Sequence, residues 1–238
     1  MDYIAPWLET ISWSKPNQET VFLIMRHGEV EGNNPKNENE YIMTGSRTDL
    51  SLNQRGMAQA EKIARKIYFL QEQGLIKIAA IYSSPLKRAS ETANYLSHML
   101  ELPVQYRTDL REIDWGDADG QLVKTKHEKW DQAEQLITEL MPDRKARWDH
   151  LPPIPNAEKY NQVLAKVHSE LHSISKIHKD NIVLIVTHGR VIKNLLIDSN
   201  NFDERYMPYP QNCGIAVFRT NQGSLDFIEI RNNSSQRK

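Results

Sequence analysis

Short apolar runs along the chain alternate with stretches whose apolar residues recur at helical spacing. Three runs, at residues 20–25, 78–82 and 181–187, have the length and the composition of buried strands. Two further runs, 213–219 and 225–230, flank an Asn-Gln-Gly turn and predict a hairpin near the end of the chain. This alternation of strands and helices predicts an α/β fold with a largely parallel sheet.

The first helix is expected to begin at Ser51, because Ser51 and Gln54 have the spacing of a capping box. Its end is expected at Gly74, since glycine suits the exit from a helix. Between these limits the apolar residues that recur at helical intervals are Met57, Ala60, Ile63, Ile67 and Leu70.

A second helix is expected to run to about Leu100, with Pro85 in its first turn. A short strand near Val104 then leads to a polar loop. Residues 124–178 are expected to be mostly helical, and the apolar, proline-rich segment 152–155 interrupts them as a turn rather than a linker.

The chain is expected to form one domain, because its most informative motifs lie near opposite ends and belong together chemically. We place an N-terminal arm at 1–19, the domain at 20–231 and a frayed polar tail at 232–238. Trp7 and Trp13 are expected to pack the arm onto the domain.

Composition and charge reduce the number of protein classes to which this chain can belong. The formal net charge of −1 gives no overall attraction to nucleic acid or to an anionic membrane, so a bound anion needs a local cluster of cations. Cys213 is the single cysteine, which excludes an intrachain disulfide and fits a reducing cytoplasm. The N-terminal residues do not have the pattern of a signal peptide, and no apolar run is long enough for a membrane helix.

Polar residues follow three of the predicted strands directly. In layered α/β folds, ligands bind beyond the carboxyl ends of the strands. We therefore expect one pocket to gather three dipeptides: Arg26-His27, Ser83-Ser84 and His188-Gly189.

Five ordered motifs resemble those of the histidine phosphatase superfamily, the phosphoglycerate mutase-like group of branch 1. The resemblance covers most of the chain and implies a three-layer α/β/α sandwich of the phosphoglycerate mutase-like type. The motifs are LIMRHGEVEGN at 23–33, Leu50-Ser51-Leu52 with Gly56, Ser84-Pro85-Leu86 with Arg88, Leu110-Arg111-Glu112, and Val186-Thr187-His188-Gly189.

The residue types also suit phosphoryl transfer. Arg26 and Arg88 supply guanidinium groups that match phosphate oxygens. A neutral imidazole can attack phosphorus, and the resemblance assigns the nucleophile to His27 and a further hydrogen-bond donor to His188. One carboxyl group can protonate the leaving oxygen and later activate water, a role that the resemblance gives to Glu112.

Other assignments stay open at this stage. Asp114, Asp117 and Asp119 are alternatives to Glu112 as the acid, and Arg88 could pair with Glu91 or Glu61 instead of a phosphate. The resemblance implies substrate contacts for four residues, although the second and third could form a plain turn: Asn33, Thr44, Gly45 and Gly189.

The chemistry requires no metal, because the positive groups already supply the role of a cation. His168 and His172 have a metal-binding spacing, but they lack a third ligand. The sequence departs from the family pattern at Asn156-Ala157-Glu158, which puts the usual supporting role of Glu158 in doubt.

These observations predict a metal-independent phosphatase that acts on a small phosphomonoester. The enzyme alternative is a cofactor-dependent phosphoglycerate mutase, which alone would need 2,3-bisphosphoglycerate, and the other alternative is a non-catalytic module that binds a phosphorylated ligand. Neither nucleic acid nor membrane is expected as a partner. A homodimer is compatible with the sequence, which identifies no interface.

Overall fold

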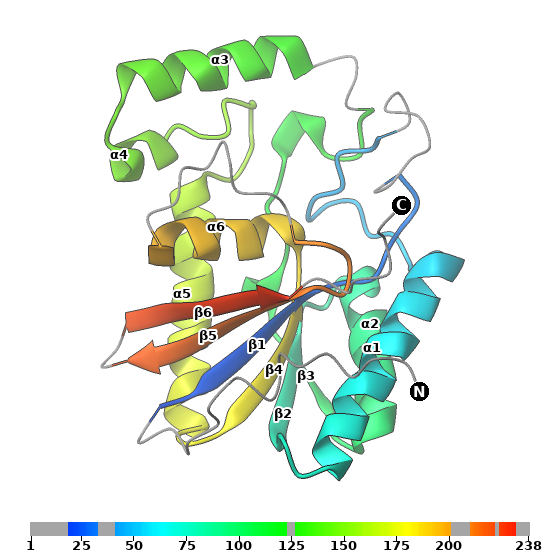
Figure 1. The fold of residues 1–238 in the computed structure, drawn as a ribbon. Helices are drawn as coiled ribbons and strands as arrows, with labels where there is room; N and C mark the ends of the chain where they lie inside the picture. The colour runs from blue at the N-terminus through cyan, green and yellow to red at the C-terminus, as the bar shows by residue number, and fades with distance from the viewer. Residues whose placement is uncertain (1–18, 33–40, 123–126, 201–209, 222–223, 232–238) are drawn as a thin grey trace.

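One twisted sheet organises the computed structural model, which describes residues 19–32, 41–122, 127–200, 210–221 and 224–231. The strand order is β3-β2-β4-β1-β5-β6 (Figure 1). Four neighbouring strands run parallel, and β5 and β6 add an antiparallel edge. The strands are β1 (Val21–Arg26), β2 (Ile78–Ser83), β3 (Val104–Tyr106), β4 (Ile182–Thr187), β5 (Ile215–Asn221) and β6 (Ser224–Arg231).

Helices cover both faces of this sheet, which gives the three-layer α/β/α sandwich expected above (Figure 1). Figure 1 also places α3 and α4 outside these layers, beyond α6. The helices are α1 (Gln54–Glu72), α2 (Lys87–Leu100), α3 (His127–Leu140), α4 (Arg144–Trp148), α5 (Tyr160–Ile177) and α6 (Gly189–Asn200), with short 3₁₀ turns η3 (Thr108–Leu110) and η4 (Gly116–Ala118).

The alternation of side chains in the central strands creates two cores. In β1, Leu23 and Met25 face the side covered by α1 and α2, whereas Phe22 and Ile24 face α5 and α6. A strand with both faces buried is apolar throughout. This explains why the central strands read as continuous hydrophobic runs in the sequence.

The start of α1 differs from the expected capping box. Asn53 is the N-cap, and its side chain accepts a hydrogen bond from the Gly56 amide at 2.8 Å. Leu52 forms an antiparallel bridge with Val30, so the chain stays extended past Ser51. Met57 is 43% exposed instead of buried.

Gly56 takes the buried position in the first turn of α1. A Cβ atom at Gly56 would lie 2.1 Å from the Glu29 carbonyl oxygen, so only glycine allows this approach. The helix therefore packs its first turn against the segment that follows β1, next to the polar end of that strand.

The remaining elements agree closely with those predicted from the sequence. The second helix begins at Lys87, so Pro85 lies just before it rather than in its first turn. Residues 152–155 form the turn between α4 and α5, and the hairpin of β5 and β6 is present. Residues 1–18 of the predicted arm at 1–19, with Trp7 and Trp13, and the tail at 232–238 lie outside the described residues.

Candidate active site

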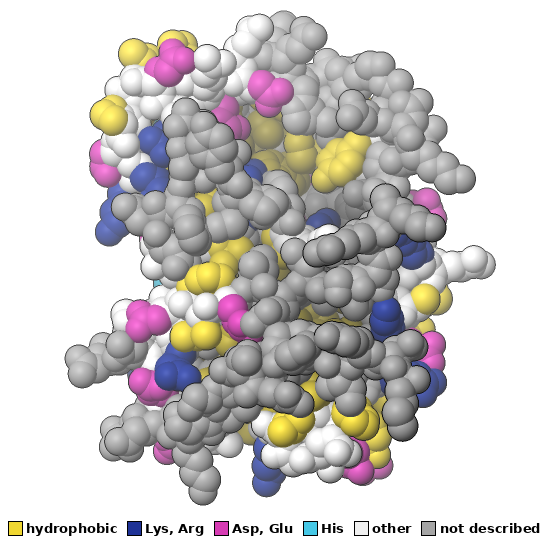
Figure 2. Space-filling model, in the orientation of Figure 1, with side chains coloured by type: hydrophobic (Ala, Val, Ile, Leu, Met, Phe, Trp, Pro, Cys, Tyr) yellow, Lys and Arg dark blue, Asp and Glu magenta, His cyan; other side chains and the backbone are white. Residues whose placement is uncertain are grey.

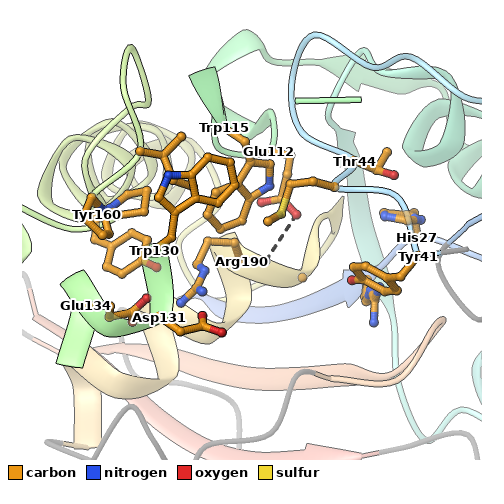
Figure 3. A pocket seen from close by; sticks show the side chains of 16 residues that line it. His27, Tyr41, Thr44, Glu112, Trp115, Trp130, Asp131, Glu134, Tyr160 and Arg190 are labelled. Atoms are coloured by element: carbon orange, nitrogen blue, oxygen red, sulfur yellow. Dashed lines mark hydrogen bonds between the residues drawn. The ribbon is translucent and has the colours of Figure 1, made fainter. Parts of the chain in front are cut away.

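A cavity of about 280 Å³ lies at the carboxyl ends of β1 and β4, where the sequence places its polar motifs. In the orientation of Figure 1, hydrophobic side chains lie at the bottom of a hollow beside α3 (Figure 2). The residues lining the cavity come from distant parts of the chain and are shown in Figure 3: Arg26, His27, Tyr41, Met43, Thr44, Glu112, Trp115, Trp130, Asp131, Glu134, Pro152, Pro153, Ile154, Tyr160, Gly189 and Arg190.

His27 follows β1 and is buried at this cavity. Its Nδ1 donates a hydrogen bond to the Gly28 carbonyl oxygen at 2.6 Å, so a neutral ring carries its lone pair on Nε2. Burial, together with the positive charges of Arg88 and Arg26, holds the pKa of His27 well below its ordinary value. The imidazole is therefore neutral and nucleophilic at physiological pH.

His188 follows β4 and lies beside His27, with 5.2 Å between the two ring centroids. Burial and the charge of Arg88 also hold the pKa of His188 well below its ordinary value. The Nε2 atom of His188 pairs with the Ser84 hydroxyl at 2.8 Å. That hydroxyl accepts the Leu86 amide at 3.3 Å, so its own proton is available to His188.

Arg88 is buried next to the histidines instead of pairing with a helix neighbour. Its two terminal nitrogens donate to the carbonyl oxygens of Thr48 and Gly45, at 2.8 and 2.9 Å. Burial lowers the pKa of Arg88, and the negative charge of Glu112 opposes that effect.

The carboxylates considered as alternative partners of Arg88 are used elsewhere. Glu91 accepts a hydrogen bond from the Leu52 amide at 2.8 Å, and Glu61 forms an ion pair with Arg65 on the surface of α1. The alternative that Arg88 pairs with Glu91 or Glu61 is therefore wrong.

Arg26 ends β1 and lines the cavity, and its Nη1 donates to the Pro210 carbonyl oxygen at 2.8 Å. The Nε atoms of Arg26 and Arg88 and the Nδ1 atom of His188 are buried and have no hydrogen-bond partner within the described part of the chain. Buried polar groups are normally paired, so unpaired nitrogens around a neutral histidine fit a site for an anion.

Glu112 lines the cavity and is buried. Its carboxyl oxygens accept the amides of Ile113 at 3.1 Å and Arg190 at 3.2 Å. Burial raises the pKa of Glu112, although the charge of Arg88 opposes the rise. A raised pKa favours the protonated form of a carboxyl group, which is the form that can give a proton to a leaving oxygen.

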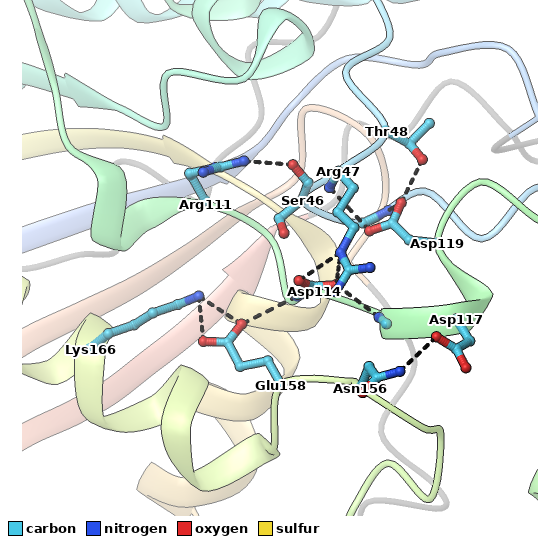
Figure 4. Close-up of polar contacts among 12 residues, drawn as sticks. Ser46, Arg47, Thr48, Arg111, Asp114, Asp117, Asp119, Asn156, Glu158 and Lys166 are labelled. Carbon is cyan, nitrogen blue, oxygen red and sulfur yellow. Dashed lines mark hydrogen bonds and ion pairs between the residues drawn. The ribbon is translucent and has the colours of Figure 1, made fainter.

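The three aspartates considered as alternatives to Glu112 hold the surrounding loops together (Figure 4). Asp114 pairs with Arg47 at 2.8 Å, and Asp117 accepts the Asn156 side-chain amide at 3.0 Å. Asp119 accepts the Gly45 amide at 3.2 Å. They are not among the lining residues of the cavity, whereas Glu112 is.

Glu158 retains a supporting role despite its altered sequence context. Its carboxylate accepts the Asp114 amide at 3.2 Å and pairs with Lys166 at 2.8 Å (Figure 4). Glu158 therefore joins Asp114, which lies two residues after Glu112, to Lys166 of α5.

The residues with expected substrate contacts differ in position. Thr44 and Gly189 line the cavity. Gly45 is not among the lining residues, and its carbonyl oxygen accepts from Arg88. A Cβ atom there would lie 2.6 Å from a Trp115 ring carbon, so close packing explains the glycine. Asn33 lies outside the described residues.

Within the described residues, no group of three His, Cys, Asp or Glu side chains could hold a metal ion. His168 pairs with Asp198 at 3.2 Å, away from the cavity lining.

Among the described helices, none has the length and the apolarity needed to cross a bilayer.

Several residues that line the cavity were not predicted from the sequence to belong to the site. The aromatic wall contains Trp115, Trp130 and Tyr160, none of which belongs to the sequence motifs named above. Arg190 offered a signal, because it follows the His188-Gly189 dipeptide directly. Ser84 was expected at the pocket, but its contact with His188 joins the ends of two neighbouring strands and could not be predicted from the sequence.

Comparisons with known proteins agree with this geometry. The model of the histidine phosphatase superfamily (branch 1) matches residues 22–233. The chain is 27% identical over 184 residues to the uncharacterized phosphatase PhoE of Bacillus subtilis, covering 77% of this chain and 79% of that protein. It is also 27% identical over 205 residues to the metal-independent phosphoserine phosphatase of Arabidopsis thaliana, covering 80% and 76%.

Among solved structures, phosphoglycerate mutase from Bacillus anthracis has the same fold, with a TM-score of 0.68. At 20% identity, covering 92% of this chain and 95% of that one, this likeness concerns the fold alone. The five ordered motifs, the buried histidine pair and the match over nearly the whole chain lead to one conclusion: the chain belongs to branch 1 of the histidine phosphatase superfamily.

Proposed function

We propose that this protein is a metal-independent phosphatase that hydrolyses a small phosphomonoester through a phosphohistidine on His27, with Glu112 as the proton donor. The observation that carries the proposal is the set of buried, unpaired nitrogens on Arg26, Arg88 and His188 around the neutral His27 ring. A phosphoryl group carries charge on three peripheral oxygens during transfer, and donors held in place stabilise that charge.

In the first step, the Nε2 lone pair of His27 attacks phosphorus. The bond between phosphorus and the ester oxygen breaks, and its electron pair goes to that oxygen. Glu112 then gives its proton to the departing oxygen, which leaves as an alcohol. The hydrogen bond from Nδ1 of His27 to Gly28 favours the positive charge that develops on the ring.

In the second step, water attacks the phosphohistidine while the Glu112 carboxylate takes one of its protons. The bond between phosphorus and Nε2 breaks, and its electron pair returns to His27. Inorganic phosphate leaves, and Glu112 is protonated for the next cycle. The two steps need only residues of this chain and water, so the proposed mechanism contains no metal ion.

The test is the release of inorganic phosphate from a panel of phosphomonoesters in the presence of a chelator. The panel includes p-nitrophenyl phosphate, 3-phosphoglycerate, sugar phosphates and O-phosphoserine, which the name of the Arabidopsis relative suggests. We expect metal-independent release that is lost in His27→Ala, with circular dichroism showing an intact fold. Near-normal activity in this variant would exclude the mechanism.

The two alternatives are distinct outcomes of the same experiment. Isomerisation of 3-phosphoglycerate that depends on 2,3-bisphosphoglycerate, without net phosphate release, would indicate a mutase. Binding of phosphate without acid-labile phosphorylation of His27 would indicate a binding module.

Glu112→Gln tests the proton donor separately. An alkyl alcohol leaves poorly without a proton, whereas p-nitrophenolate leaves readily. We expect a loss of about 10²-fold or more in kcat/KM for alkyl phosphates and a much smaller loss for p-nitrophenyl phosphate. Asp117→Asn is the matched control, since Asp117 contacts Asn156 and does not line the cavity. Equal losses on both substrates in Glu112→Gln would remove the assignment.

A further inference from the structure

The carboxylate of Asp119 accepts three hydrogen bonds from one short segment, residues 45–48. One of its oxygens accepts the Gly45 amide at 3.2 Å and the Thr48 hydroxyl, and the other accepts the Arg47 amide at 3.1 Å (Figure 4). A carboxylate offers acceptors only, and here both of its oxygens are used on donors of this segment. Asp119 is half-buried and is not among the residues that line the cavity. Its contacts are therefore with the segment 45–48 and not with the space for a substrate.

The close approach of Asp119 to Gly45 depends on the absence of a side chain at position 45. A Cβ atom there would lie 2.2 Å from Oδ2 of Asp119. A larger residue would push the carboxylate away from the segment, so this contact requires glycine. The two residues are 74 positions apart in the sequence, and close packing joins the loops that carry them.

The carbonyl oxygens of the same segment hold the guanidinium group of Arg88. The Nη1 atom of Arg88 donates to the Thr48 carbonyl oxygen at 2.8 Å, and Nη2 donates to that of Gly45 at 2.9 Å. Both acceptors are neutral, so they fix the guanidinium without cancelling its positive charge. The two residues that hold Arg88 by their carbonyl groups are thus held themselves by Asp119.

Arg88 lies where its charge acts on the reacting groups. Its side chain is 1% exposed. Together with burial, its positive charge lowers the pKa of His27 and the pKa of His188. Burial lowers the pKa of Arg88 itself, and the negative charge of Asp119 is among those that oppose this effect. A guanidinium that is held in place before the substrate binds stabilises the charge of a phosphoryl group without reorganisation.

The other contacts of the segment involve its two middle residues. The Ser46 amide and the Arg47 side chain are tied to residues 113–114 by a hydrogen bond of 3.0 Å and an ion pair of 2.8 Å. The first and last residues of the segment, which hold the guanidinium, contact Asp119 instead. Without this carboxylate both carbonyl groups should lose their support, while the middle of the segment stays attached.

We propose that Asp119 is a positioning residue for phosphate binding: its carboxylate fixes the segment 45–48, and the carbonyl oxygens of that segment hold Arg88 beside the two histidines. The proposal rests on the proposed phosphatase function, in which Arg88 binds the phosphoryl group. It also gives Asp119 and Glu112 different tasks. Asp119 acts on the binding of phosphate whichever alcohol leaves, whereas Glu112 acts on the leaving oxygen.

The first measurement is the binding of inorganic phosphate by Asp119→Asn in calorimetry, which needs no turnover. The asparagine keeps one oxygen but turns an N–H donor toward the segment, so part of the segment loses its acceptor. We expect the dissociation constant of phosphate to rise about tenfold. Asp117→Asn is the matched control, since it makes the same change in the same loop at a residue that contacts Asn156, and it should leave phosphate binding unchanged.

The second measurement is kcat/KM for two kinds of ester. In Asp119→Asn, kcat/KM should fall by about the same factor, roughly tenfold, for alkyl phosphates and for p-nitrophenyl phosphate. A loss confined to alkyl phosphates would contradict the proposal, because that pattern is the signature of a proton donor.

A double-mutant cycle shows whether Asp119 acts through Arg88. Arg88→Met removes the guanidinium, keeps a long side chain, and should itself weaken phosphate binding. In the Arg88→Met background, Asp119→Asn should weaken the binding no further. Losses that multiply in the double variant would overturn the proposal, because Asp119 would then act independently of Arg88. Phosphate binding that is absent in the wild type, or that Arg88→Met leaves unchanged, would overturn it as well.

Circular dichroism shows whether each variant folds. If Asp119→Asn does not fold, Thr48→Val decides, since it removes one donor to Asp119 and keeps the carbonyl group that holds Arg88. Weaker phosphate binding in Thr48→Val, with no further loss in the Arg88→Met background, supports the proposal, and unchanged binding refutes it. Failure of the phosphatase function would appear separately, as the absence of His27-dependent phosphate release from every ester, while calorimetry still decides the role of Asp119.

Discussion

At the scale of single residues, the hydrogen bond between Ser84 and His188 decides which imidazole nitrogen carries the proton. The Ser84 hydroxyl accepts the Leu86 amide, and we expect it to donate its own proton to Nε2 of His188. The neutral His188 ring then carries its proton on Nδ1, the buried atom with no partner in the described structure. We therefore predict that Ser84 is a positioning residue that prepares His188 to donate to a phosphate oxygen.

Ser84→Ala should lower kcat/KM by about tenfold to a hundredfold, since removing one partner of a buried hydrogen bond costs roughly 1–3 kcal/mol. The direct readout is the ¹⁵N NMR signature of His188. We expect the Nδ1–H tautomer in the wild type and a mixture of tautomers in the variant. A wild-type spectrum with the proton on Nε2 would contradict the assignment, whatever the effect on rate.

At the scale of elements, the sequence predicted the type of each main element better than its limits. Buried strands such as β4 are apolar on both faces and need no tertiary information to be recognised. The N-terminus of α1 was misplaced because Ser51 has the correct local spacing for a cap. The bridge between Val30 and Leu52, formed by segments distant in the chain, moves the cap to Asn53.

The residues of the candidate site also fall into two groups, those that lie in local sequence motifs and those that only the tertiary structure brings together. His27, Glu112 and His188 stand in motifs at the ends of elements, so local sequence identified them. The aromatic and acidic wall comes from Trp115, just before η4, and from residues of α3 and α5 such as Tyr160, which follow no shared motif. Their meeting depends on how α3 and the turn at 152–155 lie over the carboxyl ends of the strands. The sequence therefore pointed to the motif residues of the cavity, whereas its aromatic and acidic wall became visible only in the structure.

At the scale of the whole molecule, two buried histidines tie the stability of the fold to pH. The pKa values of His27 and His188 are held well below their ordinary value, so both rings are neutral when folded and take up protons on unfolding in mild acid. The free energy that they contribute is fully present above the unfolded pKa of about 6.5 and is lost as pH falls below it. Glu112 acts in the opposite direction, because its raised pKa favours the folded state as pH falls.

The unfolding free energy should therefore decrease between pH 6.5 and 5.5, and each histidine should contribute up to about 1.4 kcal/mol per pH unit. Urea titrations across this range measure the slope. His27→Gln or His188→Gln should reduce the slope even if the variant is less stable at every pH, and Glu112→Gln should make it steeper. His150→Gln, at an exposed position, is the control and should leave the slope unchanged. An unchanged slope in both histidine variants would mean that these rings do not stay neutral in the fold, and the neutral nucleophile would lose its support.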